Sequence, residues 1–300
     1  MSLRHRCCVF GEVLVDIFPD GQHVLGGAPF NVAWHLQAFG AVPRFISRVG
    51  DDTAGRAIRR AMSEWGMDTA FLQTDKNRPT GRVTVRIEKD EPHYDIVPDC
   101  AYDFIASEPQ GQNDCNLLYH GTLALRNPAS EQALLDLKTH FSGTLFMDAN
   151  LRAPWWSREM VLALIQDADW VKLNEQELEL LDLEKQPLRI RAQRFRETHA
   201  LKGLVVTRGE AGAIAFTENA APIEVKPAHT PQVVDTVGAG DAFSAVLLLG
   251  LSRKWPLALT MARAGEFAAQ VLGKRGATIQ EQIFYQSLLQ AWQSAPRTQS

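Results

Sequence analysis

A short glycine-rich stretch that ends in a carboxylate stands directly before an apolar run, in DTVGAGDAF at residues 235–243. If the apolar run from Ala242 to Leu251 is a helix, the backbone N–H groups at its start and the helix dipole attract anions such as phosphate. Gly238 and Gly240 lack a Cβ, so a ligand can approach the backbone closely. Asp241 would lie beside that anion, where a carboxylate can accept a proton from a hydroxyl that attacks phosphorus.

The same stretch has a simpler interpretation, because an isolated aspartate beside a glycine-rich turn is more often a helix cap. A bare GxG is also weak evidence for a phosphate site. The sequence contains no GxxxxGK[ST], and no GxGxxG follows the first apolar strand, which argues against a P-loop and against the usual dinucleotide fold. The rest of the chain has to decide between a cap and a catalytic base.

The elements that would position this turn alternate between strands and helices. Apolar strands are predicted at residues 7–18, 43–50, 116–123, 143–150, 169–174 and 203–209, and amphipathic helices at residues 27–40, 53–67, 131–141 and 158–168. This alternation predicts an α/β fold in which a mostly parallel central sheet is sandwiched by helices. Residues 81–97 instead have the pattern of a β-hairpin. We therefore expect one domain over residues 1–300, with a small β-sheet lid formed by about residues 12–26 and 81–104.

Composition excludes several classes of partner. The 300 residues carry a net charge of −4 and an isoelectric point near 6.1, which argues against nucleic acid and anionic membranes. No uncharged apolar stretch is long enough to span a bilayer, and the N-terminal apolar run is too short for a signal peptide. The cysteines show neither CxxC spacing nor a metal-binding pattern, and Cys7 and Cys8 are interpreted as small apolar fillers of a buried strand. These features favour a reducing cytoplasm.

Four further segments, taken with DTVGAGDAF, resemble the ribokinase-like, or PfkB-type, carbohydrate kinases. LGGAPFNVAWHLQAFGA followed by ISRVGDDTAGRAI is similar to the family's N-terminal signature, DTVGAGDAF to its C-terminal signature, KLNEQE to its NxxE element and VVTRGEAG to its VTxGxxG turn. The resemblance runs from Phe10 to about Ala277, which is nearly the whole chain. GExLVD, GGAPFN and DCAYDFI look most like the bacterial fructokinases. The resemblance implies the ribokinase-like fold.

The resemblance also implies roles for the residues around the sugar. Asp241 would be the general base, and Gly238, Ala239 and Gly240 would form the anion hole. Sugar hydroxyls would be held by Asp16, Gly27 and Asn31, and carboxylates and amides suit that task. Asp16 has independent support from the sequence, because a charge within an apolar strand must be paired or used. Gly27 has an alternative role as the turn that enters a helix.

The nucleotide and its ions would bind further along the chain. In the family the pair equivalent to Asn174 and Glu177 organises Mg²⁺ and its waters, although these residues also fit a helix capping box. The resemblance places the nucleotide beside Thr207, Gly209, Gly212 and Gly240, with Gly265 near the adenine. A K⁺ site that uses mostly backbone oxygens would be formed by Asp235, Val237, Val271, Lys274, Gly276 and Gln280. Arg152 either contacts a phosphate or braces its loop through Asp148.

The expected reaction is transfer of the γ-phosphoryl group of ATP, with Mg²⁺, to a neutral ketohexose, namely D-fructose at O6. Ala28 stands where family members for phosphorylated sugars carry a lysine, and YDIVPDCAYDF offers Asp95, Asp99 and Asp103 but no cation for an acidic sugar. Alternatives are a kinase for 2-keto-3-deoxygluconate, ribose or a nucleoside, and a catalytically silent sugar-binding homologue. Pairing of two lids would make a homodimer.

Overall fold

The fold is built around a large central β-sheet. The computed structural model describes residues 6–88, 91–107, 115–226 and 233–294. In that part of the chain nine strands form one sheet in the order β13-β12-β11-β10-β9-β8-β1-β4-β5. The pairs from β11 across to β5 are parallel, whereas β12 and β13 are antiparallel, so the predicted mostly parallel sheet is confirmed. The strands are β1 (Arg6–Phe10), β4 (Arg44–Gly50), β5 (Leu72–Asp75), β8 (Cys115–His120), β9 (Thr144–Asp148), β10 (Trp170–Asn174), β11 (Gly203–Thr207), β12 (Ala213–Thr217) and β13 (Ile223–Val225).

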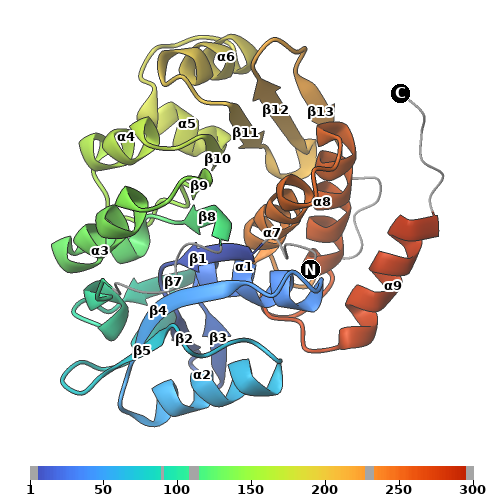
Figure 1. The fold of residues 1–300 in the computed structure, drawn as a ribbon. Helices are drawn as coiled ribbons and strands as arrows, with labels where there is room; N and C mark the ends of the chain where they lie inside the picture. Colours follow the sequence, from blue (N-terminus) through green and yellow to red (C-terminus); the bar gives the residue numbers. More distant parts are fainter. Residues whose placement is uncertain (1–5, 89–90, 108–114, 227–232, 295–300) are drawn as a thin grey trace.

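Helices cover both faces of this sheet (Figure 1). One face packs against α1 (Ala28–Ala38), α2 (Thr53–Glu64), α7 (Ala239–Ser252), α8 (Leu257–Leu272) and α9 (Gln282–Ser294). The other packs against α3 (Pro128–Thr139), α4 (Arg158–Gln166), α5 (Glu175–Leu181) and α6 (Leu188–Thr198), together with the 3₁₀ turns η1 (Ala101–Phe104) and η3 (Leu123–Arg126). Successive residues of β1 alternate between the two cores, because side chains on a strand point to opposite faces. The strand is therefore apolar from Cys7 to Phe10, as is usual for a doubly covered sheet.

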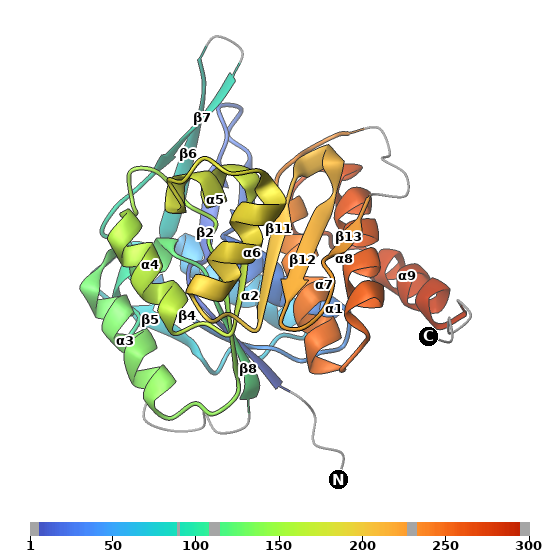
Figure 2. The same cartoon turned by 90° about the horizontal axis from the view of Figure 1, so that it is seen from above.

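A second, smaller sheet has the order β3-β2-β6-β7. Its strands are β2 (Leu14–Ile17), β3 (His23–Gly26), β6 (Gly81–Glu88) and β7 (Glu91–Ile96). They come from both segments in which the lid was expected, and β2 pairs in parallel with β6. Figure 2 shows β6 and β7 rising away from the main body.

The chain passes from one sheet to the other immediately after β1. The prediction of a single strand over residues 7–18 was wrong, because residues 11–13 separate β1 in the large sheet from β2 in the small one. Gly11 makes this crossing possible. It has a φ of 147°, and a Cβ there would lie 2.5 Å from Cγ of Pro29. Both sides of the crossing are buried, so apolar residues stand on either side of Gly11 and Glu12 and hide the change of sheet.

Cys8 on β1 and Cys115 on β8 form a disulfide, with their Cα atoms 5.8 Å apart. The interpretation of Cys8 as a simple apolar filler was therefore wrong, whereas Cys7 is a buried free thiol within the apolar core, as expected. The two bonded cysteines lie 107 residues apart in sequence. They meet because β1 and β8 are neighbours with a register shift between Arg6 and Cys7. Sequence spacing carries no signal of such a contact.

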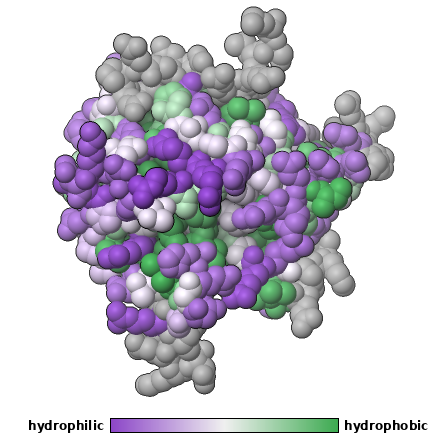
Figure 3. All heavy atoms as spheres, turned by 90° about the horizontal axis from the view of Figure 1, so that it is seen from below, coloured by the Kyte–Doolittle hydropathy of each residue, from purple (hydrophilic) through white to green (hydrophobic). Residues whose placement is uncertain are grey.

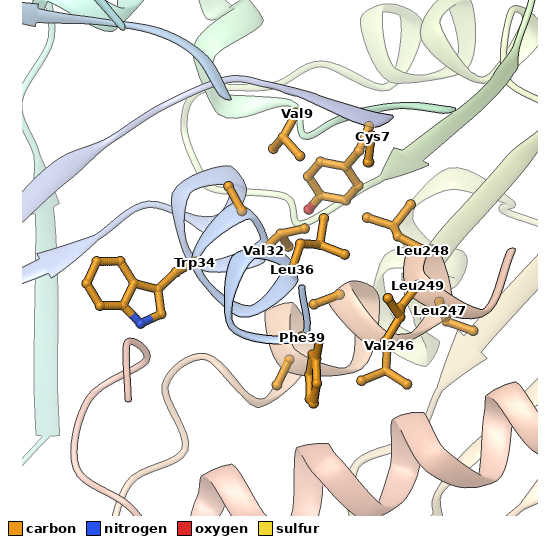
Figure 4. Close-up of a cluster of buried hydrophobic side chains, with 14 of the residues drawn as sticks. Cys7, Val9, Val32, Trp34, Leu36, Phe39, Val246, Leu247, Leu248 and Leu249 are labelled. Carbon is orange, nitrogen blue, oxygen red and sulfur yellow. The ribbon is translucent and has the colours of Figure 1, made fainter. Parts of the chain in front are cut away.

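The packing of α1 on α7 brings distant parts of the chain together. Figure 4 shows Leu36 of α1 and Phe39, which directly follows that helix, near Val246 and Leu249 of α7, and all four side chains are buried. His35 of α1 is also buried, and its contacts lie with α8 and α9: its ring packs against Phe267, and its Nδ1 lies 2.9 Å from the Tyr285 hydroxyl. Burial lowers the pKa of His35 to about 3, so this histidine is neutral at pH 7 and has a structural role.

The outer surface is largely polar. Figure 3 shows one face on which hydrophilic side chains predominate and apolar ones show only in a few separate areas. Within the described residues, no helix combines the length and the apolar character that crossing a membrane requires.

Candidate active site

A cavity of about 1360 Å³ lies between the small sheet and the main body. Asp16, Val83 and Tyr94 line it from the small sheet, and Lys172 and Asp241 line it from the body. It opens beyond the carboxyl end of β1. At β1 the order of the parallel strands reverses, since β4 lies on one side and β8 on the other. Ligands of open α/β sheets usually bind at such a switch point.

Helix α7 begins at this cavity, which Gly238, Gly240 and Asp241 line. Gly238 is the N-cap residue and has the left-handed conformation, with φ 84° and ψ −6°. A Cβ on Gly238 would lie 2.4 Å from Cβ of Ala277, so only glycine fits this turn. No side chain caps the helix. The N–H groups of Ala239 and Gly240 and the positive end of the helix dipole therefore remain available to an anion.

Asp241 lies in the first turn of α7 and faces the cavity. It is not a helix cap, because its carboxylate instead accepts a hydrogen bond from Nδ2 of Asn31 at 2.8 Å. Burial, reinforced by the Asp148 carboxylate, raises the pKa of Asp241 to about 6, although Asn31, Lys172 and Arg152 oppose the shift. A carboxylate with this pKa is mainly ionised at pH 7 and is a stronger base than an ordinary aspartate.

The residues predicted to hold the sugar line the same cavity. Asp16 lies on β2, and burial raises its pKa to about 6. Gly27 has a φ of 105° at the start of α1, and a Cβ there would lie 2.7 Å from the Glu12 carbonyl oxygen. Asn31 donates to Asp241, and its Oδ1 is buried with no hydrogen-bond partner among the residues that the structure describes. Because these residues line the same cavity as Asp241, a polyol there would find acceptors and a donor as well as the base.

Glu12 also lines the cavity, although the sequence analysis gave it no role. Glu12 is only 2% exposed, and its Oε2 has no hydrogen-bond partner among the described residues. Burial raises the pKa of Glu12 to about 7, with Asp241 adding to the shift. The argument that singled out Asp16, a charge within an apolar run, applies equally to Glu12 and could have found it.

Lys172 and Asp148 were also not recognised as a pair. Nζ of Lys172 donates to both carboxylate oxygens of Asp148, at 3.0 and 2.9 Å. Asp148 therefore pairs with Lys172, so of the two alternatives for Arg152 the contact with Asp148 was wrong. Arg152 instead lines the cavity, where its charge acts on Glu12, Asp16 and Asp241.

Asn174 and Glu177 form the capping box that the sequence allowed as an alternative. Asn174 Oδ1 accepts from the Glu177 backbone N–H, and Glu177 Oε2 accepts from the Asn174 N–H, both at 2.8 Å. Oε1 of Glu177 accepts from the Leu151 N–H at 2.8 Å, which ties α5 to the loop beside the cavity. Within the described ranges no group of three or more His, Cys, Asp or Glu residues could hold a metal ion on its own.

The other residues predicted to contact the nucleotide do not line this cavity. Thr207 ends β11 opposite Asn174 of β10. Gly209 and Gly212 both have positive φ, and a Cβ on Gly212 would lie 2.0 Å from the Val225 carbonyl oxygen. Gly212 therefore has a packing reason to be glycine. Gly265 lies within α8, and a Cβ there would meet no atom within 4 Å. Their roles stay predictions.

Five of the six residues predicted for a monovalent cation line the cavity: Asp235, Val237, Lys274, Gly276 and Gln280. Asp235 joins their two loops by accepting from the N–H groups of Val237 and Gly276, both at 3.0 Å. Val271 is buried at the end of α8, and its carbonyl already accepts from the Lys274 N–H at 2.9 Å.

The aspartates expected at the end of the lid do not face the cavity. Asp103 is buried, and it accepts two hydrogen bonds from Arg126, at 2.7 and 2.9 Å, and one from the Cys100 N–H. It is therefore unavailable to a sugar, and its expected role was wrong. Asp95 is exposed beside Arg86 at 3.6 Å. The carboxylates that do line the cavity are Glu12, Asp16, Asp235, Asp241 and Glu281.

The sequence of this chain is similar to those of known carbohydrate kinases. Residues 5–283 match the family model described as pfkB family carbohydrate kinase. A fructokinase of Klebsiella pneumoniae is 32% identical over 269 residues, which cover 83% of this chain and 85% of that protein.

Solved structures agree with the sequence match. Fructokinase from Vibrio cholerae O395, bound to fructose, ADP and a calcium ion, has a TM-score of 0.82 at 26% identity and covers 96% of this chain and 100% of its own. A doubly substituted form of that enzyme, with fructose, ADP and a potassium ion, has a TM-score of 0.81 at 26% identity, covering 95% and 98%. Aminoimidazole riboside kinase from Salmonella enterica, 24% identical with a TM-score of 0.82 and covering 95% and 100%, shares the fold. This chain is a carbohydrate kinase and belongs to the pfkB family.

Proposed function

We propose that this kinase transfers the γ-phosphoryl group of ATP to O6 of D-fructose. The observation that carries the proposal is the Asp241 carboxylate, held by Asn31 at the open N-terminus of α7 inside a cavity lined by carboxylates. Asp241 accepts the hydroxyl proton while the sugar oxygen bonds to phosphorus and the bond from phosphorus to the β-phosphate oxygen breaks, so that ADP leaves with the electron pair. The N–H groups of Gly238, Ala239 and Gly240 receive the charge of the transferring group.

Mg²⁺ fits this scheme as an ion that arrives with the nucleotide. Each carboxylate oxygen of Glu177 accepts one backbone N–H, and a second lone pair on each remains for a metal-bound water. Glu177 and Asn174 would together hold the waters of the ion, and the ion would neutralise phosphate charge. Thr207, Gly209, Gly212 and Gly265 remain the proposed nucleotide contacts.

The charge of the cavity favours a neutral sugar. Lys172 is paired with Asp148, Arg275 donates to Gln22 at 2.9 Å, and Lys274 lies over the Phe284 ring at 5.5 Å. Arg152 is the lining cation that acts on three lining carboxylates at once. An acidic sugar would therefore meet an excess of negative charge, whereas hydroxyls can donate to these carboxylates. The similar fructokinase with bound fructose points to the same substrate class.

A substrate panel tests this proposal. We expect kcat/KM for D-fructose to exceed that for 2-keto-3-deoxygluconate and for fructose 6-phosphate by at least ~10-fold, which corresponds to about 1.4 kcal/mol of charge repulsion. Initial rates with ATP and product identification by NMR provide the measurement. Ribose and a purine nucleoside serve as neutral controls, because the fold is shared with aminoimidazole riboside kinase. A higher kcat/KM for any of these compounds would assign a different substrate, and no turnover with any sugar would support the silent homologue.

We also propose that K⁺ binds between the Asp235 turn and the loop at residues 271–280. The hydrogen bonds from Val237 and Gly276 to Asp235 hold these segments together, and a structure of the similar Vibrio cholerae enzyme contains potassium. Replacing Na⁺ by K⁺ at constant ionic strength is expected to raise kcat severalfold, because the ion would fix the segment that adjoins Gly238. Equal rates in Na⁺, K⁺ and tetramethylammonium would argue against a functional cation.

The small sheet is proposed to act as a lid and to pair two subunits. Tyr94 of β7 lines the cavity yet is 50% exposed, so the described part of one chain leaves this side chain partly uncovered. A second copy could supply that cover. We expect a homodimer in light scattering at micromolar concentration, and a monomer under these conditions would contradict the pairing. A cytoplasmic location is proposed as well, because the substrate ATP is found there.

A further inference from the structure

Lys172 occupies an unusual position for a buried lysine. It lies on β10 with its side chain only 8% exposed, and it forms an ion pair with Asp148, which is 1% exposed. Asp148 also accepts from the Ser244 hydroxyl of α7 at 2.7 Å and from the Tyr119 hydroxyl at 3.4 Å. Burial alone would lower the pKa of Lys172, but the Asp148 carboxylate more than offsets it, so the pKa lies above its usual value. Lys172 is therefore a charged ammonium.

This ammonium lies directly beside the first turn of α7. A Cβ placed on Gly240 would be 3.5 Å from Nζ of Lys172, and Lys172 lines the cavity together with Gly238 and Gly240. The N-terminus of a helix carries partial positive charge, so a cation beside it is unfavourable unless an anion lies close to both. The ion pair with Asp148 offsets part of that repulsion without removing the ammonium from the cavity surface.

The simplest interpretation is a structural ion pair that anchors α7 through Ser244. That interpretation accounts for Asp148, which has four contacts from three donors, but not for the placement of the cation at the cavity. The two contacts to Asp148 occupy at most two of the three N–H donors of the ammonium. An anion bound at the α7 turn would be attracted both by the Lys172 ammonium and by the helix dipole, and it would screen the repulsion between these two positive charges.

We propose that Lys172 is a catalytic residue whose remaining N–H donates to the transferring phosphoryl group, next to the N–H of Gly240. Phosphorus forms its bond to the sugar oxygen and loses its bond to the leaving ADP oxygen, and the sugar proton passes to Asp241. Lys172 keeps its proton throughout and contributes only positive charge, which matters most when charge builds on the phosphoryl oxygens. The proposal rests on phosphoryl transfer at this site and is independent of the identity of the sugar.

Replacing Lys172 by methionine removes the charge and keeps much of the side-chain volume. We expect Lys172→Met to lower kcat by ~10²–10³-fold, the usual cost of losing one donor to a transition-state oxyanion, with the KM of the sugar within about threefold. The single variant leaves the Asp148 carboxylate buried without its counter-ion, which itself destabilises the fold. A second variant is therefore needed to separate the two effects.

The double variant Lys172→Met, Asp148→Asn makes that separation. The asparagine oxygen can still accept from Ser244 and Tyr119, and no uncompensated charge remains, so the double variant should fold with a near-native circular dichroism spectrum and Tm. We expect its kcat to stay as low as that of the single variant. Recovery to within ~10-fold of the wild-type kcat would overturn the proposal, because it would show that the pair is only structural.

Lys138→Met is the matched control. Lys138 is also a largely buried lysine paired with an aspartate, since its side chain is 9% exposed and its Nζ lies 3.4 Å from Asp167, but it is on α3 and does not line the cavity. Its kcat should remain within about threefold of wild type. A loss equal to that of Lys172→Met would overturn the proposal. Wild-type turnover measured on the same sugar tests the proposed function separately, since the proposal depends only on the ratio between variants.

Discussion

Replacing Asp241 by asparagine is expected to lower kcat by at least ~10²-fold while the KM of the sugar changes only a few-fold. The amide keeps the size of the carboxylate and can still accept the hydrogen bond from Asn31, so the α7 turn should be preserved. What disappears is the group that takes the hydroxyl proton. Steady-state rates with ATP and the preferred sugar measure the loss. A variant within a few-fold of the wild-type kcat would remove Asp241 from the mechanism.

The raised pKa of Asp241 adds a test in the pH dependence. Because protonation removes the base, kcat/KM should fall about tenfold per pH unit below pH about 6, the pKa to which burial raises this group.

Folding stability should change in the opposite sense to activity. A carboxyl whose pKa is higher in the native than in the unfolded state binds more protons when folded, so its contribution to stability is lost as pH rises through about 6. At pH 8 the Asp241→Asn variant should therefore be more stable than wild type by about 1–3 kcal/mol, with the difference gone below pH about 4. Urea unfolding at both pH values provides the measurement. A variant that is less stable than wild type at pH 8 would show that burial of the ionised Asp241 carboxylate does not destabilise the fold.

Replacing Gly238 by alanine is expected to have the second large effect, again at least ~10²-fold in kcat. The residue has a φ of 84°, and the new Cβ would lie 2.4 Å from Cβ and 2.8 Å from Cα of Ala277, so the turn has to move. Displacing the turn redirects the N–H groups of Ala239 and Gly240 away from the phosphoryl group. Rates at saturating ATP and sugar measure the loss.

Gly40→Ala is a suitable control for backbone strain. Gly40 has a φ of 75°, but a Cβ there would meet no atom within 4 Å. This variant carries the cost of a positive φ, about 1 kcal/mol, without the steric clash, and its kcat should be unchanged. If both glycine variants lose activity equally, strain of the fold rather than geometry of the turn would be responsible.

The parts of the site that the sequence predicted are those whose signal is local. The turn before α7 was predicted because its glycines, its carboxylate and the apolar helix are contiguous, and the structure adds that Asn31 lies beside Asp241. The strands from β8 to β11 were predicted because each is a short apolar run between helices. The small sheet was expected because the alternation at residues 81–97 does not fit that rhythm.

The parts that the sequence missed depend on which strands become neighbours. Cys8 meets Cys115, and Lys172 meets Asp148, only through the order and register of the central sheet. The run from Cys7 to Phe18 is apolar on both sides of Gly11, so periodicity could not reveal the change of sheet. Asp103 was misassigned because its partner Arg126 lies on a different segment. In each case a pairing between distant segments decides what a side chain does.

The burial of α7 has a consequence for how this enzyme can acquire new substrates. Residues 242–250 of the helix that carries Asp241 are buried between the central sheet and its neighbouring helices, whereas Asp16 and Tyr94 belong to a separate sheet that is joined to the body through short crossings. Substitutions on the small sheet can thus change the shape of the sugar-binding cavity without disturbing the packing that positions Asp241. Laboratory evolution of sugar preference should therefore accumulate its productive substitutions on β2, β3, β6 and β7, while α7 tolerates almost none.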